Sequence, residues 1–202
     1  TQVAAEAAFW LGGYYYQNGQ QGLSRRYFLS IVQDYPDSPA LPEVYYSLAL
    51  SFMEESRVRE AIDYFSKAFA MNNAQAKSKA AVSLGDIKFK RGEFEQAVYY
   101  YDAALKSQDS GDPRFLFVKI AEARELQGKP QEAIEYYLKA GNFISDDKKL
   151  TVKAILRAAK VYEDLGQQKD AELLYQKIIS MGVEESSHAK ENLLLIRASY
   201  KK

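Results

Sequence analysis

The side chains that could carry out chemistry are few in this sequence, and none belongs to a recognisable catalytic pattern. His188 is the only histidine, and without a nucleophile pattern around it we expect it to lie on the surface. The acidic pairs Glu54–Glu55 and Asp146–Asp147 hold the residue types of a general acid and base, but such pairs usually belong to solvated faces. The stretch DSGDP at 109–113 lacks the ligand spacing and the closing glutamate of a calcium loop, and we expect a turn there. The sequence therefore predicts a protein that is not an enzyme and holds no cofactor.

Composition narrows the classes of partner. The 202 residues include 27 Lys and Arg and 27 Asp and Glu, so no excess positive charge is available for nucleic acid or an anionic membrane surface. The most apolar stretch, VYYSLALSFM, is bounded by Glu43 and Glu54 and is shorter than the roughly 20 residues that span a bilayer; we expect no membrane insertion. Cysteine is absent, which fits either a reducing or an oxidising compartment. Because the first residue is Thr1 rather than methionine, we expect a processed or excised chain.

Three consecutive tyrosines, at 99–101, lead to the organisation of the chain. They lie in RGEFEQAVYYYDAAL at 91–105, and this pattern recurs at 18–32, 55–69, 127–141 and 165–179. Every copy has a turn residue near its start: Gly19, Ser56, Gly92, Gly128 and Gly166. A small residue follows five positions later: Ser24, Ala61, Ala97, Ala133 and Ala171. An aromatic residue follows four positions after that: Phe28, Phe65, Tyr101, Tyr137 and Tyr175. Because residues four apart share a helical face, we expect Tyr101 to be a core residue rather than part of an active site.

A second small residue precedes each turn residue by seven positions: Gly12, Ala49, Gly85, Ala121 and Ala159. The two small residues of a copy are always 12 positions apart, whereas the distance onward to the next copy is 24 to 26. Small residues let two helices approach closely, and a glycine permits the left-handed turn between them. The sequence therefore predicts a repeated helix–turn–helix unit of constant internal geometry.

This unit resembles the tetratricopeptide repeat, a helix hairpin with the pattern W-x2-L-G-x2-Y, then A-x3-F, then a closing proline. The Leu-Gly pair is present as Leu11-Gly12 and Leu84-Gly85, and the closing proline as Pro36. The resemblance covers nearly the whole chain. It implies an all-α fold, a right-handed superhelical solenoid of about five helix hairpins plus a C-terminal capping helix.

The resemblance also implies boundaries. The whole chain, 1–202, is expected to form one domain. Its repeats are expected at about 5–38, 39–74, 75–110, 111–148 and 149–183, with the capping helix at 185–200. Solenoids need such a cap because their last repeat would otherwise expose an apolar end. Three residues of the cap are expected to cover the last repeat: Leu193, Leu194 and Ile196.

In tetratricopeptide proteins the first helix of each repeat lines a concave groove, so the resemblance implies a non-enzymatic scaffold that binds a peptide or helix of a partner protein. Aromatic anchors dominate such sites. The expected peptide-binding residues come from the first three repeats: Phe9, Trp10, Tyr16, Tyr46, Leu50, Met53, Phe89 and Lys90. In the fourth and fifth repeats the groove positions carry charges of both signs: Lys119, Glu122, Glu125, Arg157, Lys160, Glu163 and Asp164.

Another interpretation stays open. The chain could be a structural or self-associating module that packs against another domain of a longer chain, with a homo-oligomer as one form of this. The aromatic cluster would then be a packing surface for an N-terminal segment rather than a binding site. Dimerisation with loss of Trp10 accessibility would favour this interpretation.

The junction between the first two repeats, FLSIVQDYPDSPALPEVYYSLA, carries a further resemblance. It is similar to the repeat junctions of bacterial cell-envelope tetratricopeptide proteins, the Tol-Pal-associated and outer-membrane assembly families, in which Tyr-Pro-x-Ser closes one unit and opens the next. Here that motif is formed by Tyr35, Pro36 and Ser38. The resemblance implies a bacterial protein of the periplasm or cell envelope, with the cytoplasm as the alternative location.

Overall fold

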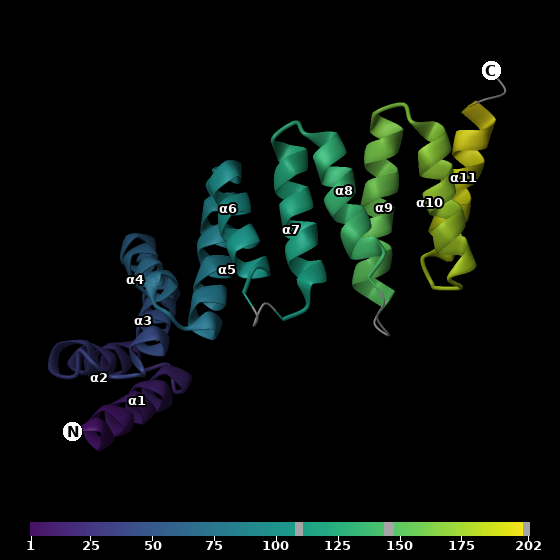
Figure 1. The fold of residues 1–202 in the computed structure, drawn as a ribbon. Helices are drawn as coiled ribbons and strands as arrows, with labels where there is room; N and C mark the ends of the chain where they lie inside the picture. Colours follow the sequence, from purple (N-terminus) through teal and green to yellow (C-terminus); the bar gives the residue numbers. More distant parts are fainter. Residues whose placement is uncertain (108–110, 144–147, 200–202) are drawn as a thin grey trace. The chain divides into compact units, whose positions relative to one another are not determined.

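The computed structural model describes residues 1–107, 111–143 and 148–199, which form eleven α-helices and no strand (Figure 1). The helices are α1 (Gln2–Gln17), α2 (Gln21–Asp34), α3 (Leu41–Glu54), α4 (Val58–Ala70), α5 (Ala74–Lys90), α6 (Phe94–Leu105), α7 (Pro113–Leu126), α8 (Pro130–Gly141), α9 (Lys148–Asp164), α10 (Gln168–Ser180) and α11 (Ser186–Ser199). Among the described residues, no helix combines the length and apolar character that a membrane crossing requires. The predicted all-α fold is confirmed.

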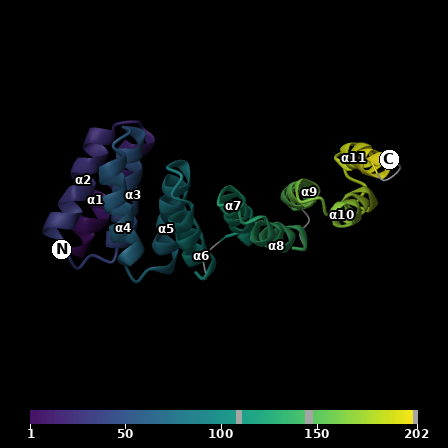
Figure 2. The ribbon, with the colours of Figure 1, turned by 90° about the horizontal axis from the view of Figure 1, so that it is seen from above.

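The chain divides into two compact units, Thr1–Ser110 and Gly111–Lys202. The first unit holds the hairpins α1–α2, α3–α4 and α5–α6, and the second holds α7–α8 and α9–α10 followed by α11 (Figures 1 and 2). Within each unit a second helix packs against its own first helix and against the first helix that follows, as α2 does with α1 and α3. The single domain expected over 1–202 stays a prediction.

The five predicted turn residues all adopt the left-handed backbone conformation. Their φ angles are 71° at Gly19, 58° at Ser56, 76° at Gly92, 71° at Gly128 and 70° at Gly166. Glycine reaches this region without steric cost, whereas Ser56 must bring a Cβ atom close to a carbonyl oxygen. One sequence position therefore makes the same turn in every hairpin, and only the second repeat makes it with strain.

The small residues of each hairpin leave room for the aromatic side chain of the second helix. A Cβ atom added to Gly12 would lie 2.5 Å from the Phe28 ring, and one added to Gly85 would lie 2.5 Å from the Tyr101 ring. Five aromatic side chains are accordingly almost fully buried: Phe28, Phe65, Tyr101, Tyr137 and Tyr175. The expectation that Tyr101 is a core residue is confirmed.

Hydrophobic clusters lie between the second helix of one repeat and the first helix of the next. In the first unit, Ile31 of α2 packs in one cluster with Val44 and Leu48 of α3. In the second unit, Ala140 of α8 packs in another with Ala154 and Ala158 of α9. These contacts stack the repeats and bring successive first helices to one face of each unit.

The last helix covers the end of the second unit, but not with all the residues expected. Ala189, Leu193 and Ile196 of α11 are buried in a cluster with α10, whereas Leu194 is 68% exposed. The expectation for Leu194 is therefore wrong. Positions 189, 193 and 196 share one helical face, while Leu194 lies about 100° around the helix from Leu193.

The loop residues considered for chemistry fall partly outside the described ranges. Asp109, Asp146 and Asp147 lie outside them. Asp112 is described, and its carboxylate accepts a hydrogen bond of 3.0 Å from the backbone N–H of Arg114 at the start of α7. This is the N-cap role that a turn sequence before a helix predicts.

Candidate functional site

A hollow of about 280 Å³ lies on the first-helix face of the first unit. Its walls come from α1 and α3, with one residue each from α2 and α5. The lining residues are Phe9, Gly13, Tyr16, Gln17, Phe28, Glu43, Tyr46, Ser47, Leu50 and Lys79. Gly13 contributes to the opening, because no neighbouring atom lies within 4 Å of the place where its Cβ would be. The hollow thus has apolar and aromatic walls with a few polar groups among them.

A second hollow of about 440 Å³ adjoins the first along α1. The two share Phe9, Gly13, Gln17, Phe28 and Ser47, and the second adds Glu6, Trp10 and Tyr14. We call the two hollows together the α1–α3 groove. Its residues are those that the two linings contain.

Ring contacts hold the aromatic side chains of the groove in place. The Phe9 ring lies 6.0 Å from that of Phe28, and the Trp10 ring is stacked on that of Tyr14 at 5.6 Å. The Tyr46 ring lies 5.6 Å from the buried Phe65 ring. Such pairs add to the stability gained by burial, so the groove is formed before any ligand arrives.

Polar groups are placed beside these rings. The ammonium group of Lys79 lies 5.9 Å from the centre of the Tyr46 ring, within cation–π range. Burial, followed by the charge of the Glu54 carboxylate, raises the pKa of the Tyr16 hydroxyl above its usual value. Lys79 therefore places a cation in the groove, and the Glu54 carboxylate, which does not line the groove, lies close to Tyr16.

The structure brings together five of the eight expected binding residues. Phe9, Trp10, Tyr16, Tyr46 and Leu50 line the α1–α3 groove. The other three do not line it. Met53 packs against a hydrophobic cluster formed by α3, α4 and α5. The Phe89 ring contacts the Phe94 ring at 5.5 Å, and Lys90 is exposed.

The repeat register also places four further lining residues at groove positions, although they were not among the expected binding residues: Gly13, Gln17, Ser47 and Lys79. Sequence reasoning missed the other four residues of the groove: Glu6, Tyr14, Phe28 and Glu43. Glu6 and Glu43 stand six positions before Gly12 and Ala49, a spacing that places them on the groove face and could have found them. Phe28 stands at the repeat position of Tyr101 and is almost fully buried, yet it lines both hollows. No sequence signal distinguishes a buried ring that lines a groove from one that does not.

The corresponding face of the second unit is polar. The Tyr137 hydroxyl donates a 3.0 Å hydrogen bond to Glu125, which also accepts bonds of 2.8 and 2.9 Å from Arg157. In the next repeat, the Tyr175 hydroxyl donates a 2.8 Å bond to Glu163, which is bonded to Lys160 at 2.8 Å. Burial is the main cause that raises the pKa of both tyrosines.

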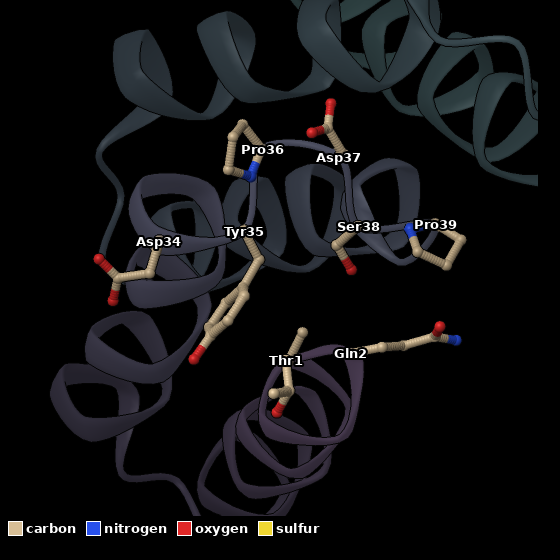
Figure 3. Close-up of a pocket in the computed structure, with 9 residues that line it drawn as sticks. Thr1, Gln2, Asp34, Tyr35, Pro36, Asp37, Ser38 and Pro39 are labelled. Carbon is tan, nitrogen blue, oxygen red and sulfur yellow. The ribbon is translucent and has the colours of Figure 1, made fainter.

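A separate hollow of about 300 Å³ lies in the first unit, between the start of α1 and the junction that follows α2 (Figure 3). Residues 1, 2 and 5 and residues 34–39 line it. The Tyr35 side chain extends from the junction toward α1 (Figure 3). None of the expected binding residues lines this hollow.

The described residues offer no grouping of side chains suited to a metal ion. Within those ranges, no three His, Cys, Asp or Glu side chains are grouped so that they could hold a metal ion. His188 is exposed on α11, as the sequence predicts. The aromatic groove of the first unit is therefore the strongest candidate site.

Comparisons with solved structures support the fold. The chain is similar to the MamA protein, with 16% sequence identity over 93% of this chain and 96% of that one and a TM-score of 0.69. It is also similar to MamA from Desulfovibrio magneticus RS-1, with 15% identity, 89% and 95% coverage and a TM-score of 0.64. For pilF of Pseudomonas aeruginosa the identity is 18%, the coverage 98% and 89%, and the TM-score 0.62. Likeness at these identities concerns the fold alone.

Sequence comparison identifies the repeat directly. No curated protein sequence matches the chain. One tetratricopeptide repeat profile matches residues 46–113 and 83–147, which together span more than half of the chain. A second tetratricopeptide repeat profile matches 6–38 and 153–181. The chain therefore belongs to the tetratricopeptide repeat family.

Proposed function

We propose that this protein is a non-enzymatic scaffold whose α1–α3 groove binds a peptide segment of a partner protein. The observation that carries this proposal is the preformed aromatic groove, which five of the expected binding residues line. Aromatic side chains that are already fixed lose little conformational entropy when a ligand binds. A repeat protein with this groove is suited to anchoring side chains of a partner.

The shape and chemistry of the groove favour a particular kind of peptide. Its hollows, of about 280 and 440 Å³, lie near the lower end of the roughly 300–1,000 Å³ typical of small-molecule pockets. They suit one or two apolar side chains of an extended or helical segment. Lys79 and Glu43 stand at the edge of the apolar walls and can bind the carbonyl and N–H groups of the segment.

The remaining expected residues extend the proposed site along the first helices. Met53 and Phe89 each follow the small residue of their repeat by four positions, so they belong to the first-helix face beyond the groove. The flexible thioether of Met53 can adapt to a ligand. Lys90 adds a cation at the end of α5. We expect these three residues to contribute less than the groove itself.

The experiment is selection of peptides from a displayed random library on the full chain, followed by affinity measurement with two variants. Tyr46→Ala removes a groove wall and should weaken binding about 30-fold, as expected for a buried aromatic anchor. Tyr99→Ala removes an exposed tyrosine that lies outside the groove and should leave affinity unchanged. Selected peptides whose affinity is insensitive to Tyr46→Ala would contradict the proposal.

A second candidate function is self-association or packing against another domain. The observation that favours it is the 67% exposure of the Trp10 side chain, which is large for an indole ring. Sedimentation velocity of the chain over a range of concentrations tests it. Formation of a homo-oligomer with a blue shift in Trp10 fluorescence would favour this candidate over peptide binding.

We further propose that the protein works in a bacterial cell envelope. The support is the Tyr35-Pro36-x-Ser38 junction, in which the Ser38 N–H donates to the Tyr35 carbonyl and the Ser38 carbonyl accepts from Leu41. The test is the sequence of the full precursor together with fractionation of the source cells. A precursor without an export signal, found in the cytoplasmic fraction, would refute this location.

A further inference from the structure

A hollow of about 550 Å³ lies in the second unit. It lies where α7, α9 and α11 begin, and all three helices begin at the lower end of that unit in Figure 1. The lining residues are Phe115 of α7, Lys149, Leu150, Lys153 and Leu156 of α9, and Glu185, which directly precedes α11. We call it the α7–α9 hollow. It shares no residue with the α1–α3 groove.

The repeat register places the α7–α9 hollow on the first-helix face of its unit. Phe115 and Lys153 each stand six positions before the small residue of their first helix. Glu6 and Glu43 stand at the same position in the first two repeats, and they line the α1–α3 groove. The α7–α9 hollow is therefore the counterpart of that groove in the second unit.

The charge at this repeat position differs between the two hollows. It is negative at Glu6 and Glu43 in the α1–α3 groove and positive at Lys153 in the α7–α9 hollow. Lys149 also lines the α7–α9 hollow, and residues four apart on a helix are neighbours on one face. Glu185 is the one acidic residue among the six that line it. The α7–α9 hollow thus favours a ligand with negative charge.

Lys153 also differs from the cations that follow it on α9. The Arg157 guanidinium lies 2.8 Å from the Glu125 carboxylate, and the Lys160 ammonium group lies 2.8 Å from that of Glu163. Among the residues that the structure describes, no carboxylate lies within ion-pair distance of exposed Lys153. The Lys153 ammonium group can therefore pair with a ligand without giving up a partner of its own.

Apolar side chains form the rest of the hollow. The Phe115 side chain is 60% exposed, and Leu150 and Leu156 are half-buried. The residues at the position of Phe115 in the other four repeats are all charged: Glu6, Glu43, Lys79 and Lys153. An exposed ring beside a cation suits a ligand that carries an apolar side chain close to an acid.

We propose that the α7–α9 hollow binds an acidic peptide segment of a partner protein, in which an aspartate or glutamate stands next to a large apolar residue. The apolar side chain packs against Phe115, Leu150 and Leu156, and the carboxylate pairs with Lys153. The apolar walls exclude part of the water around this ion pair and so strengthen it. The glutamates of the α1–α3 groove repel the same peptide, so the two hollows select different segments.

The experiment is selection on the full chain from two displayed peptide libraries that differ only in charge. Random apolar positions are flanked by aspartate and glutamate in one library and by lysine and arginine in the other. We expect binders of this site from the acidic library alone, with an affinity that falls as salt is added. A random library also contains acidic peptides. Those that bind this site are recognised by their sensitivity to Lys153→Glu and are set apart from the peptides that test the α1–α3 groove.

Four variants locate the bound acidic peptide. Lys153→Glu and Phe115→Ala should each weaken its affinity at least about tenfold, because they remove the cation and the apolar wall. Lys169→Glu makes the same charge change at an exposed residue of α10 outside the hollow and should leave the affinity nearly unchanged. Tyr46→Ala should also leave it unchanged, so this result does not depend on whether the α1–α3 groove binds a peptide. Circular dichroism confirms that each variant is folded.

Three results would overturn the proposal. The first is an acidic library that yields no binders, or binders with equal affinity for the parent and Lys153→Glu chains. The second is a dimer of the chain alone that is lost in Lys153→Glu, because a second copy would then occupy the hollow. The third concerns Asp146 and Asp147, which precede α9 in the sequence. An affinity at least tenfold higher after both are changed to asparagine would mean that the chain's own carboxylates occupy the site.

Discussion

The first-helix faces of the first two and the last two repeats differ in the aromatic residue that the second helix buries beneath them. The third repeat, in the first unit, has a tyrosine there, Tyr101, whose hydroxyl donates to Asp86. In the first two repeats the buried aromatic residue is phenylalanine, Phe28 or Phe65, and the face is lined by rings. In the last two repeats it is tyrosine, Tyr137 or Tyr175, and its hydroxyl is bonded to a carboxylate on the face. A tyrosine hydroxyl at this position of the second helix thus coincides with a polar first-helix face, and its absence with an apolar one.

The reason is that a tyrosine ring can be buried while its hydroxyl still needs a partner. In the second unit Glu125 and Glu163 accept from the tyrosines and are themselves paired with cations of the same face. Their bonding capacity is largely used inside the protein, so a ligand would have to displace existing bonds. The phenylalanine repeats make no such demand and leave apolar walls open to a ligand.

The largest expected effect comes from introducing a buried tyrosine at the same position of the second repeat. In the other repeats, the carboxylate that pairs with the tyrosine stands one or four positions after the small residue of the first helix. The second repeat has Leu50 and Met53 at these two positions. Phe65→Tyr should therefore bury an unpaired hydroxyl and destabilise the chain by about 1–3 kcal/mol in urea unfolding. Adding Met53→Glu should restore part of the loss. A single Phe65→Tyr variant as stable as the parent would show that the hydroxyl needs no carboxylate partner.

Removing a buried tyrosine hydroxyl from the second unit should lower stability by a smaller amount, and this loss should depend on pH. Tyr137→Phe loses the hydrogen bond to Glu125 and should cost about 1–2 kcal/mol. The folded state raises the pKa of Tyr137, so the stability that this tyrosine contributes is complete below its unfolded pKa of about 10 and falls as pH rises above it. Unfolding measured from pH 9 to 12 should therefore show a shallower loss of stability for Tyr137→Phe. Parallel curves for the two proteins would contradict the assigned role.

A third prediction concerns the small residue of the second helix, which is serine only in the first repeat. The Ser24 hydroxyl is buried and finds no hydrogen-bond partner among the described residues. Ser24→Ala should stabilise the chain by about 1 kcal/mol, since it removes an unsatisfied group. The matched control is Ser51→Ala, because the Ser51 hydroxyl accepts a 3.1 Å bond from Arg25. If both substitutions shift the melting temperature in the same direction, the explanation for Ser24 is wrong.

The smallest expected effect lies at the one strained turn. Ser56 adopts a φ of 58° where the other four hairpins have glycine. Ser56→Gly should relieve the left-handed strain of about 1–2 kcal/mol, less the roughly 0.5–1 kcal/mol of extra chain entropy that glycine loses on folding. The net gain should be about half a kcal/mol in thermal unfolding. A destabilised variant would mean that the serine side chain makes a compensating contact.

Much of the fold followed from spacing in the sequence. The turn residues, the small residues and the buried aromatic residues were all predicted by position, because a helix hairpin of fixed geometry demands them. The run NLLLI did not reveal that Leu194 is exposed, since three adjacent leucines fit several helical rotations. The tyrosine partners were also beyond prediction. Asp86 stands one position after its small residue and accepts from Tyr101, whereas Glu125 and Glu163 stand four positions after theirs.

The candidate site could be predicted only in part, because it also depends on local packing. The repeat register selected Phe9, Trp10, Tyr16, Tyr46 and Leu50, and these five residues line one groove. It also selected Met53 and Phe89, which pack against neighbouring side chains instead. Register determines which face a residue lies on, but local packing determines whether that residue lines a hollow.

The central claim, that the apolar face of the first unit binds the partner peptide, is tested most directly by cross-linking at two equivalent positions. Ser47 and Arg157 each stand two positions before the small residue of their first helix, and the chain has no native cysteine. A selected peptide with a cysteine beside its apolar anchor is incubated with the Ser47→Cys and Arg157→Cys chains, and the disulfide-linked product is quantified by mass spectrometry. We predict a cross-linked product with Ser47→Cys and little with Arg157→Cys. Preferential linkage to Arg157→Cys would contradict the assignment of the binding site to the first unit.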